Sequence, residues 1–469
     1  MHQNFEKLSR RGFLKLSAAA VGVSALTVLA ACSPAAPAES GSAASAPGAG
    51  AEKVEISFYE WGTALDKQVS DSTIADFQAA NPNITVRLEQ APGGQHYDKL
   101  QASLAGGTAA DVINNQTWLW QSFSAKGVYA ALDDLRARDD YNTPYPDAWA
   151  NTYDVQTKFR GKLFGVPWNM GAMLIFYSKA PFDRVGIPYP TADWTYDEFV
   201  ELTQQLTEEV DGVQHYGYQT NTSYERLASW MRLNGDKEWD QEIEPTKAMW
   251  DQEYIMDMIN FQLYACVNEF KVSPTPAMME GGLNDMDSGN VAMTMEGPWF
   301  FPKMACGDWA CTPEQLAAGG VPYGVVQMPK SPKGTRAHMV FGHVVLLNNA
   351  SKHQDEAWEF MKFQGGEGAQ KYVATSGRQP VTPEFNEKYW FSDTKEKWGL
   401  EDPQPFLDAF ESGVLHVAGE VDDRVITNEV FGPARDRMIA GDADAYTVVP
   451  EMNAKIQEML DAYWEKQKS

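Results

Sequence analysis

The most informative segment of the chain reads VEISFYEWGT and occupies residues 54–63. Its apolar residues alternate with polar ones before a glycine and a threonine, which predicts a strand followed by a turn. The next predicted element is an amphipathic helix that ends at Asn81-Pro82, because the residue before a proline is disfavoured in the α conformation. A strand at 84–88, a helix ending at Gly106-Gly107 and a strand leading to Asn114-Asn115-Gln116 follow. Such alternation of strands and helices indicates an α/β fold.

The composition excludes some classes of protein. The chain has 469 residues, of which 43% are apolar, so it is long enough for more than one hydrophobic core and is not disordered as a whole. It carries 38 basic and 64 acidic residues, a formal net charge of −26. Nucleic acid is therefore not an expected partner, since an acidic surface repels phosphate backbones.

The N-terminus is predicted to be an export signal. Residues 1–31 have a basic start and a short apolar run, and Ser9-Arg10-Arg11-Gly12-Phe13-Leu14-Lys15 resembles a twin-arginine signal. Leu29-Ala30-Ala31-Cys32 resembles a bacterial lipobox, in which Cys32 becomes a diacylated N-terminus; the alternative is an ordinary buried cysteine. Residues 32–52 would then be the lipidated cysteine and a flexible Ala, Ser, Pro and Gly tether. We expect an extracytoplasmic protein, anchored by lipid to the outer face of the cell membrane.

Three further cysteines bear on the redox state. Cys306 and Cys311 are five positions apart, so a short loop-closing disulfide between them is the favoured pairing, with Cys266 buried and reduced. The other pairings stay open at this stage. The cysteine and histidine spacing matches no zinc pattern, and we expect neither a metal nor a cofactor.

Helix starts and one strand have clear local signals. Thr195 and Glu198 have the spacing of a capping box, and so do Ser351 and Gln354. The continuous apolar run at residues 344–347 predicts a strand buried on both faces.

A series of short motifs, in a fixed order, resembles family-1 extracellular solute-binding proteins over roughly residues 53 to 469. These are the carbohydrate-capturing components of bacterial ATP-binding-cassette (ABC) importers. The motifs are FxxxNPxIxV at 77–86, YDKL at 97–100, LAGGTxxDV at 104–112, GKLFGVP at 161–167, IFYSK at 175–179, GNVAM at 289–293, EGPW at 296–299, SKH at 351–353, AWEF at 357–360 and GRQP at 377–380. Each motif is weak evidence alone, and their order carries the resemblance.

The resemblance implies a two-lobed, type II periplasmic-binding-protein-like α/β fold, with hinge segments joining the lobes around a ligand cleft. The expected lobe boundaries are 53–167 and 336–383 for the first lobe, and 168–335 and 384–469 for the second. The expected crossings lie near 167–176, 328–341 and 380–389. A carbohydrate ligand, membrane permease subunits and a monomeric state are expected from the same resemblance, and hinge closure around ligand is typical of such folds.

A sugar presents hydroxyl groups at its edge and C–H patches on its faces, so its receptor needs flat rings and planar polar groups. Side chains at the carboxyl ends of strands are the natural candidates. We predict ligand contacts from Trp61, Asn115, Gln116, Trp168, Asn169, Glu296, Trp299, Phe341, His343 and Arg378. Trp299 ranks first among the stacking residues because the resemblance implies that the Gly-Pro-Trp tryptophan lines the sugar cleft.

Structural roles compete with several of these assignments. The tryptophans could belong to the core, Asn115 and Gln116 could cap the next helix, and Glu296 could pair with Arg378 instead of the ligand.

Two other functions remain open. A secreted glycoside hydrolase would need two carboxyl groups flanking the scissile bond, and the sequence places no second carboxyl beside Glu296. A surface-anchored glycan sensor or adhesion module would share every feature above. An enzyme is not expected.

Overall fold

The structure is a computed structural model, and it describes residues 53–91, 93–117, 119–142, 149–280, 282, 285–309, 311–414 and 423–468. These residues all belong to the compact unit formed by 51–469. The predicted signal peptide, Cys32 and the whole tether, residues 1–52, lie outside the described residues.

A six-stranded sheet forms the framework of the fold. It contains β1 (Val54–Trp61), β2 (Ile84–Ala91), β3 (Val112–Gln116), β6 (Gly165–Ala172), β12 (His338–Leu347) and β13 (Gly413–Val414). The strand order is β13-β12-β3-β1-β2, and β6 also pairs with β12. The strands β1, β2 and β3 run parallel, whereas β12 is antiparallel to both β3 and β6. All ten residues of β12 are buried, as the apolar run at 344–347 predicted.

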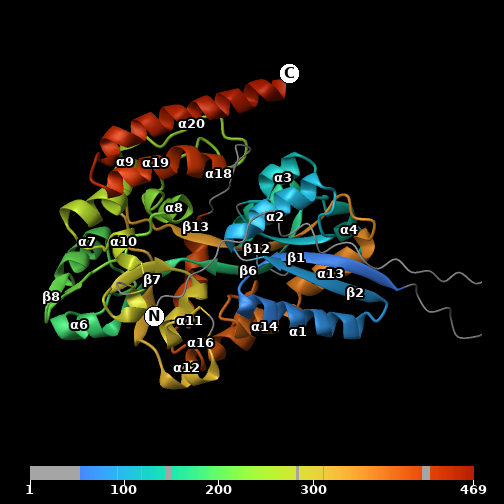
Figure 1. The fold of residues 1–469 in the computed structure, drawn as a ribbon, viewed down its shortest axis with the longest axis horizontal. Helices are drawn as coiled ribbons and strands as arrows, with labels where there is room; N and C mark the ends of the chain where they lie inside the picture. The colour runs from blue at the N-terminus through green and yellow to red at the C-terminus, as the bar shows by residue number, and fades with distance from the viewer. Residues whose placement is uncertain are drawn as a thin grey trace, which may run out of the picture. The chain divides into compact units, whose positions relative to one another are not determined.

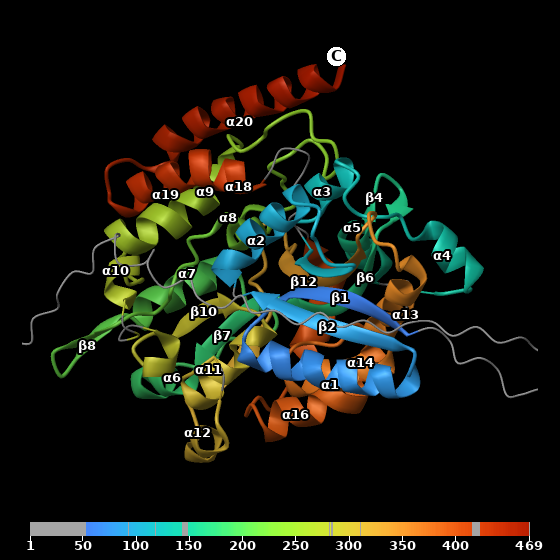
Figure 2. The ribbon, with the colours of Figure 1, turned by 45° about the vertical axis from the view of Figure 1, so that its right-hand side comes forward.

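Helices cover both faces of this sheet (Figures 1 and 2), which gives it the expected α/β layering. On one face lie α1 (Ala64–Ala80), α13 (Gln354–Gly365) and α14 (Glu367–Thr375); on the other lie α2 (Gly93–Ala105) and α3 (Gln121–Ala125). Two separate hydrophobic clusters fill the spaces between these helices and the sheet.

A second, smaller sheet begins with the strand that follows β6 in the chain. It has the order β10-β7-β11 and is antiparallel, with β7 at Leu174–Ser178, β10 at Met293–Glu296 and β11 at Tyr323–Val326. Only Met173 separates β6 of the larger sheet from β7 of the smaller one, and the chain returns to the larger sheet between β11 and β12. The chain therefore passes between two α/β layers, as a two-lobed fold requires.

The remaining elements are mostly short. Near the smaller sheet are α6 (Lys179–Val185), α7 (Tyr196–Gln205), α8 (Tyr224–Met231), α10 (Pro276–Met279), the 3-10 turns η4 (Met286–Ser288) and η5 (Pro298–Phe300), α11 (Phe301–Cys306) and α12 (Pro313–Ala318). A layer of α9 (Glu253–Asn260), η3 (Phe261–Glu269), α18 (Asp423–Ile426), η8 (Thr427–Phe431), α19 (Gly432–Ile439) and α20 (Ala445–Lys468) packs together, with α20 lying across α9 and α19 (Figure 1). The others are α4 (Asp133–Arg138), α5 (Ala150–Thr157), β4 (Lys158–Phe159), β5 (Lys162–Leu163), β8 (Glu208–Val210), β9 (Val213–His215), α15 (Pro383–Phe385), η6 (Asn386–Trp390), α16 (Phe391–Glu396), α17 (Gln404–Asp408) and η7 (Ala409–Ser412).

One of the two predicted capping boxes is confirmed and the other is wrong. The Thr195 hydroxyl accepts from the backbone N–H of Glu198, and the Glu198 carboxylate accepts from the backbone N–H of Thr195. At the other site α13 begins at Gln354, so this residue is the first of the helix and not the third. The Ser351 hydroxyl instead donates to Asp111 at 2.7 Å, a partner that only the tertiary fold supplies.

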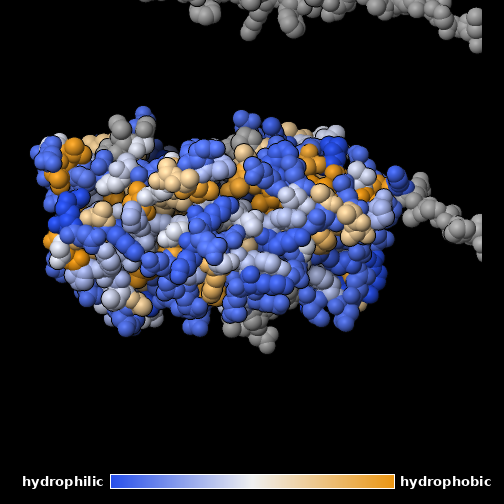
Figure 3. Space-filling view, turned by 90° about the horizontal axis from the view of Figure 1, so that it is seen from below, coloured by the Kyte–Doolittle hydropathy of each residue, from blue (hydrophilic) through white to orange (hydrophobic). Residues whose placement is uncertain are grey.

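The predicted cysteine pairing is confirmed. Cys306 and Cys311 are joined by a disulfide, and Cys266 is buried with a free thiol. Figure 3 shows hydrophilic residues over most of the face seen from below. Within the part of the chain that the structure describes, no helix has the length and apolar character needed to cross a bilayer.

We expect Gly342→Ala to destabilise the protein by about 1 to 3 kcal/mol, because overpacking forces backbone shifts. A Cβ at this position of β12 would lie 1.9 Å from the carbonyl oxygen of Asn169 on β6, and a backbone atom cannot move aside without shifting its strand. Urea denaturation measures the change. Gly366→Ala is the matched control, since its Cβ would meet nothing closer than 3.4 Å. Equal stability of the two variants would contradict the prediction.

Candidate functional site

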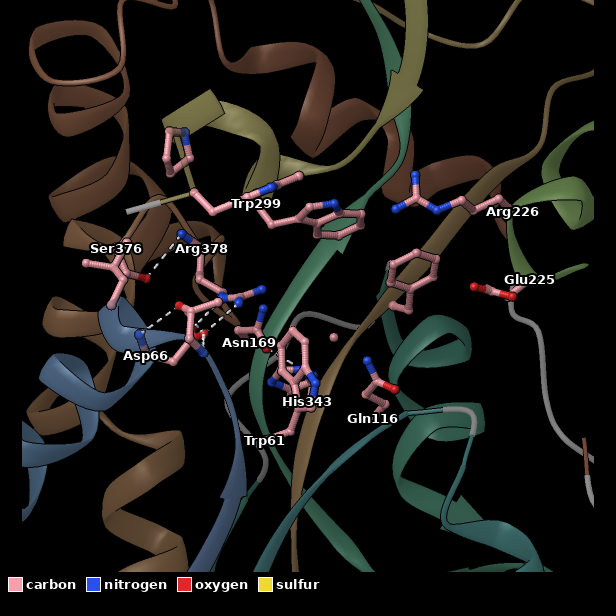
Figure 4. Close-up of a pocket in the computed structure, with 16 residues that line it drawn as sticks. Trp61, Asp66, Gln116, Asn169, Glu225, Arg226, Trp299, His343, Ser376 and Arg378 are labelled. Carbon is pink, nitrogen blue, oxygen red and sulfur yellow. Dashed lines mark hydrogen bonds and ion pairs between the residues drawn. The ribbon is translucent and has the colours of Figure 1, made fainter. Parts of the chain in front are cut away.

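A cavity of about 340 Å³ opens where the carboxyl ends of several strands meet (Figure 4). Seven of the ten predicted ligand-contact residues line it: Trp61, Gln116, Asn169, Trp299, Phe341, His343 and Arg378. The lining is completed by Thr63, Leu65, Asp66, Glu225, Arg226, Pro302, Trp309, Gly342 and Ser376. Trp299 and Arg226 lie on one side of the cavity, and Trp61, Gln116 and His343 lie on the other.

Trp61, the last residue of β1, is held by two neighbours. Its ring meets that of His343 edge to face, with centroids 5.0 Å apart. The guanidinium of Arg378 lies 5.5 Å from the centroid of the Trp61 ring, a cation–π distance. The indole is therefore fixed in position at the wall of the cavity.

Arg378 owes its position to a buried ion pair with Asp66, in the first turn of α1. The Arg378 Nε and Nη2 donate to the two carboxylate oxygens of Asp66 at 2.8 and 3.0 Å. Thr63 caps the same helix and donates to Asp66 through its backbone N–H and its hydroxyl. Burial would raise the pKa of Asp66, but the charge and hydrogen bonds of Arg378 outweigh it and hold the pKa below its usual value. Asp66 is thus an ionised anchor for the guanidinium.

Trp299 is anchored by a second ion pair. Its Nε1 donates to Glu296 Oε2 at 2.8 Å, and Arg226 donates to the other oxygen of Glu296. The ring stacks on Phe341 with centroids 5.0 Å apart and folds back over Gly297, where a Cβ would lie 2.1 Å from it. The suggested pairing of Glu296 with Arg378 is wrong, since each of the two has a different partner.

A β-bulge shapes the middle of the site. His343 of β12 faces Asn169 of β6, but Val344 faces Pro167, so Trp168 is the extra residue on β6. The bulge leaves Trp168 buried behind His343, with the two rings stacked at 5.6 Å, and outside the lining of the cavity. Asn169 Oδ1 accepts from the backbone N–H of His343 at 3.0 Å. The amide nitrogen of Asn169 has no partner among the described residues.

The His343 ring is neutral at physiological pH. Burial, helped by the positive charge of Arg378, lowers the pKa of His343 to about 3. A neutral imidazole offers one donor and one acceptor, which suits hydroxyl groups.

Asn115 and Gln116 are neighbours with different surroundings. Asn115 Oδ1 accepts from the Tyr97 hydroxyl at 2.7 Å and its amide donates to Tyr129, so this side chain is buried and used within the protein. Gln116, at the end of β3, lines the cavity, and its amide has no partner in the described part of the chain. Alternate residues of a strand point to opposite faces, which explains the difference.

Three predicted contacts therefore lie outside the lining: Asn115, Trp168 and Glu296. Sequence reasoning missed Asp66, Glu225, Arg226 and Trp309. The capping-box spacing from Thr63 to Asp66 marks the start of α1, and Trp309 stands inside the Cys306–Cys311 loop, so both had a usable signal. No local sequence pattern indicates that Arg226 or Glu225 lines the cavity.

The charges around the cavity balance. Asp66 and Glu225 face Arg226 and Arg378, and the histidine is neutral, so the formal charge of the lining side chains is zero. No cluster of three His, Cys, Asp or Glu side chains able to hold a metal is present in the residues that the structure describes. Rings, planar amides and balanced charge together suit a neutral, hydroxyl-rich ligand.

Comparison with protein families and sequences identifies relatives over most of the chain. The model of the bacterial extracellular solute-binding proteins matches residues 57–371. A putative binding protein of Brucella abortus is 24% identical over 328 residues, which cover 66% of this chain and 71% of the relative.

Solved structures share the fold. An ABC substrate-binding protein of Listeria monocytogenes, in complex with cycloalternan, superposes with a TM-score of 0.74 at 20% identity over 87% of this chain and 100% of that one. The GacH receptor of Streptomyces glaucescens, solved unliganded and with acarbose, gives a TM-score of 0.69 at 18% identity over 87% of this chain and 98% of that one. The fold is therefore the two-lobed α/β fold of these sugar-binding proteins.

Glu60, the residue before Trp61 in β1, has a buried carboxyl group. Ser70 and Gln90 donate to its two oxygens, and burial raises the pKa of Glu60 to about 8. The folded protein keeps a proton on Glu60 that the unfolded chain releases above about pH 4.5. The resulting stabilisation is complete below about pH 4.5, declines as the pH rises from there to about 8, and is lost above it.

We therefore expect Glu60→Gln to remove this pH dependence. Between pH 7 and 8 the free energy of unfolding of the wild type should fall by about 1 kcal/mol relative to that of the variant. Urea denaturation of both proteins at the two pH values provides the measurement. Parallel pH profiles would show that Glu60 does not carry the buried proton.

Proposed function

The chain belongs to the bacterial extracellular solute-binding protein family, and we propose that it captures a sugar or oligosaccharide and delivers it to the permease of an ABC importer. The family places the chain outside the cytoplasm, and its members and structural neighbours are binding proteins, not enzymes. The neighbours named above were solved with cycloalternan and acarbose, which supports a carbohydrate ligand.

The observation that carries the proposal is the combination of fixed rings and unpaired planar amides around one cavity. The rings of Trp61, Trp299 and Phe341 line it together with the amides of Gln116 and Asn169. Such rings pack against the C–H faces of a sugar, and the amides bind its hydroxyl groups. Because buried pairs already hold the rings in place, little conformational entropy is lost on binding.

Arg378 and His343 supply further hydrogen-bonding groups in this proposal. Asp66 occupies Nε and Nη2 of Arg378, so its Nη1 is left for a ligand hydroxyl. Three of the predicted contacts support the lining residues instead of binding the ligand in this proposal. Trp168 stacks on His343, Glu296 accepts from Trp299, and Asn115 accepts from Tyr97.

We further propose that the lobes comprise 53–167 with 336–383, and 168–335 with 384–469, and that they close on the ligand about hinges near 167–176, 328–341 and 380–389. The abrupt change of sheet at Met173 and the return between β11 and β12 support the first two hinges. Closure would bring the Trp299 side of the cavity toward the Trp61 side.

The proposed anchor is a diacylglycerol on Cys32, with residues 33–52 as a tether to the binding domain. Two acyl chains suffice for stable anchoring without a membrane-spanning helix. We expect the wild type to fractionate with membranes and Cys32→Ser to lose this association, as judged by immunoblotting of membrane and soluble fractions. Mass spectrometry of the N-terminal peptide should show the acyl groups. An unmodified, uncleaved N-terminus in the wild type would contradict the anchor.

The test of binding is a thermal-shift screen of mono-, di- and trisaccharides, followed by calorimetry on each sugar that raises the unfolding temperature. Gln116→Ala should weaken the affinity for that sugar by about three- to tenfold and leave the unfolding temperature unchanged, because its amide serves only the cavity. Asn115→Ala is the matched control. It should lower the unfolding temperature, because the Tyr97 hydroxyl and the backbone N–H of Gln116 each lose a hydrogen bond to the Asn115 side chain.

The reverse pattern in the Gln116 and Asn115 variants would contradict the assignment of the site. A screen in which no saccharide binds, or the release of reaction products from a saccharide, would contradict the proposed function.

A further inference from the structure

Trp309 differs from every other tryptophan that the structure describes. It is 47% exposed, whereas the others are buried or partly buried. It also lines the same cavity as Trp61 and Trp299. An exposed indole is unfavourable in water unless a ligand or partner covers it.

The loop that carries Trp309 is closed covalently. The Cys306–Cys311 disulfide encloses it, and the Asp308 carboxylate accepts from the backbone N–H of Trp309 at 2.7 Å. The Trp309 ring has only light support from the protein: Phe300 lies 5.9 Å away between centroids, and Lys303 Nζ lies 5.9 Å from its centroid. The backbone is thus constrained while much of the ring stays open.

The loop that carries Trp309 lies close to Trp299 along the chain. Trp299 lies in η5, α11 follows at once, and Cys306 is the last residue of that helix. The Trp309 ring packs against Phe300, the residue after Trp299, whereas the Trp299 ring stacks on Phe341. The two indoles are therefore separate stacking surfaces of the same cavity, one partly buried and one exposed.

We propose that Trp309 forms an outer subsite that stacks on a second sugar unit, so that the ligand is an oligosaccharide of at least two rings. This inference rests on the proposed function. The inner unit occupies the wall formed by Trp61, Gln116 and Trp299, and the next unit covers the exposed face of Trp309. The charge balance of the cavity and the openness of the Trp309 ring both fit a neutral ligand that extends out of the cavity.

The disulfide then has a role in chain-length selectivity. With the Cys306–Cys311 bond intact, Trp309 is held at the mouth of the cavity at little entropic cost to binding. With the bond removed, the ring samples more positions, and only the outer sugar unit loses affinity.

The experiment uses the full chain and matched ladders of one, two and three sugar units in the gluco-, galacto-, xylo- and chito- series, with calorimetric Kd values. The variants are Trp309→Ala, Trp309→Phe and the double variant Cys306→Ser/Cys311→Ser. Phe270→Ala is the control, since Phe270 is 42% exposed and lies outside the lining of the cavity.

We expect the wild type to bind two or three units more tightly than one. Trp309→Ala should weaken the longer sugars by about three- to tenfold and the monosaccharide by less than about twofold. Trp309→Phe should retain part of the preference, the double variant should reduce it, and Phe270→Ala should leave it intact. Unchanged unfolding temperatures for the Trp309 variants would exclude misfolding.

Two outcomes overturn the inference and leave the proposed function standing: a wild type with no preference for longer sugars, and a Trp309→Ala variant that affects all chain lengths equally or none. A wild type that binds no sugar in any series defeats the proposed function itself, and the outer subsite with it.

Discussion

Strand β12 is the constraint on which the site depends. It is buried over its whole length and is hydrogen-bonded to β3 on one side and to β6 on the other. Phe341 and His343 project from it into the cavity, and Gly342 lets the Asn169 carbonyl approach closely. Because backbone groups inside a protein must be paired, the strand cannot shift without breaking both ladders. The neighbouring Gln116 and Asn169 are positioned by those same ladders.

Two ion pairs extend this rigidity to the rings. Asp66 holds Arg378 beside Trp61, and Glu296 connects Arg226 to the indole of Trp299. Each pair joins residues that are far apart in the sequence and compensates its own buried charge. The wall of the cavity therefore presents aromatic surface in a fixed arrangement and little net charge, a combination that suits a hydroxyl-rich ligand better than an ionic one.

The sequence predicted the α/β layering, the buried strand and the strand ends that supply most of the lining, since these follow from local periodicity. It could not separate Trp168 from Asn169, because a bulge in the pairing of β6 with β12 decides which one faces the cavity. The partners of Glu296 and Arg378 depend on long-range packing, and so does the bond from Ser351 to Asp111 that replaces the predicted capping box. The cysteine spacing around Trp309 indicates a closed loop, but only the tertiary fold brings the ring of Trp309 to the cavity.

The late position of β12 in the chain has a kinetic consequence. β3 and β6 are synthesised long before the strand that joins them, so a nascent chain holds two unpaired strand edges until residues 338–347 emerge. Unpaired edges promote aggregation, and pairings between distant segments form slowly. Folding of this domain should therefore be slow and should benefit from a chaperone that shields those edges, and a chain truncated before β12 should aggregate instead of forming a smaller receptor.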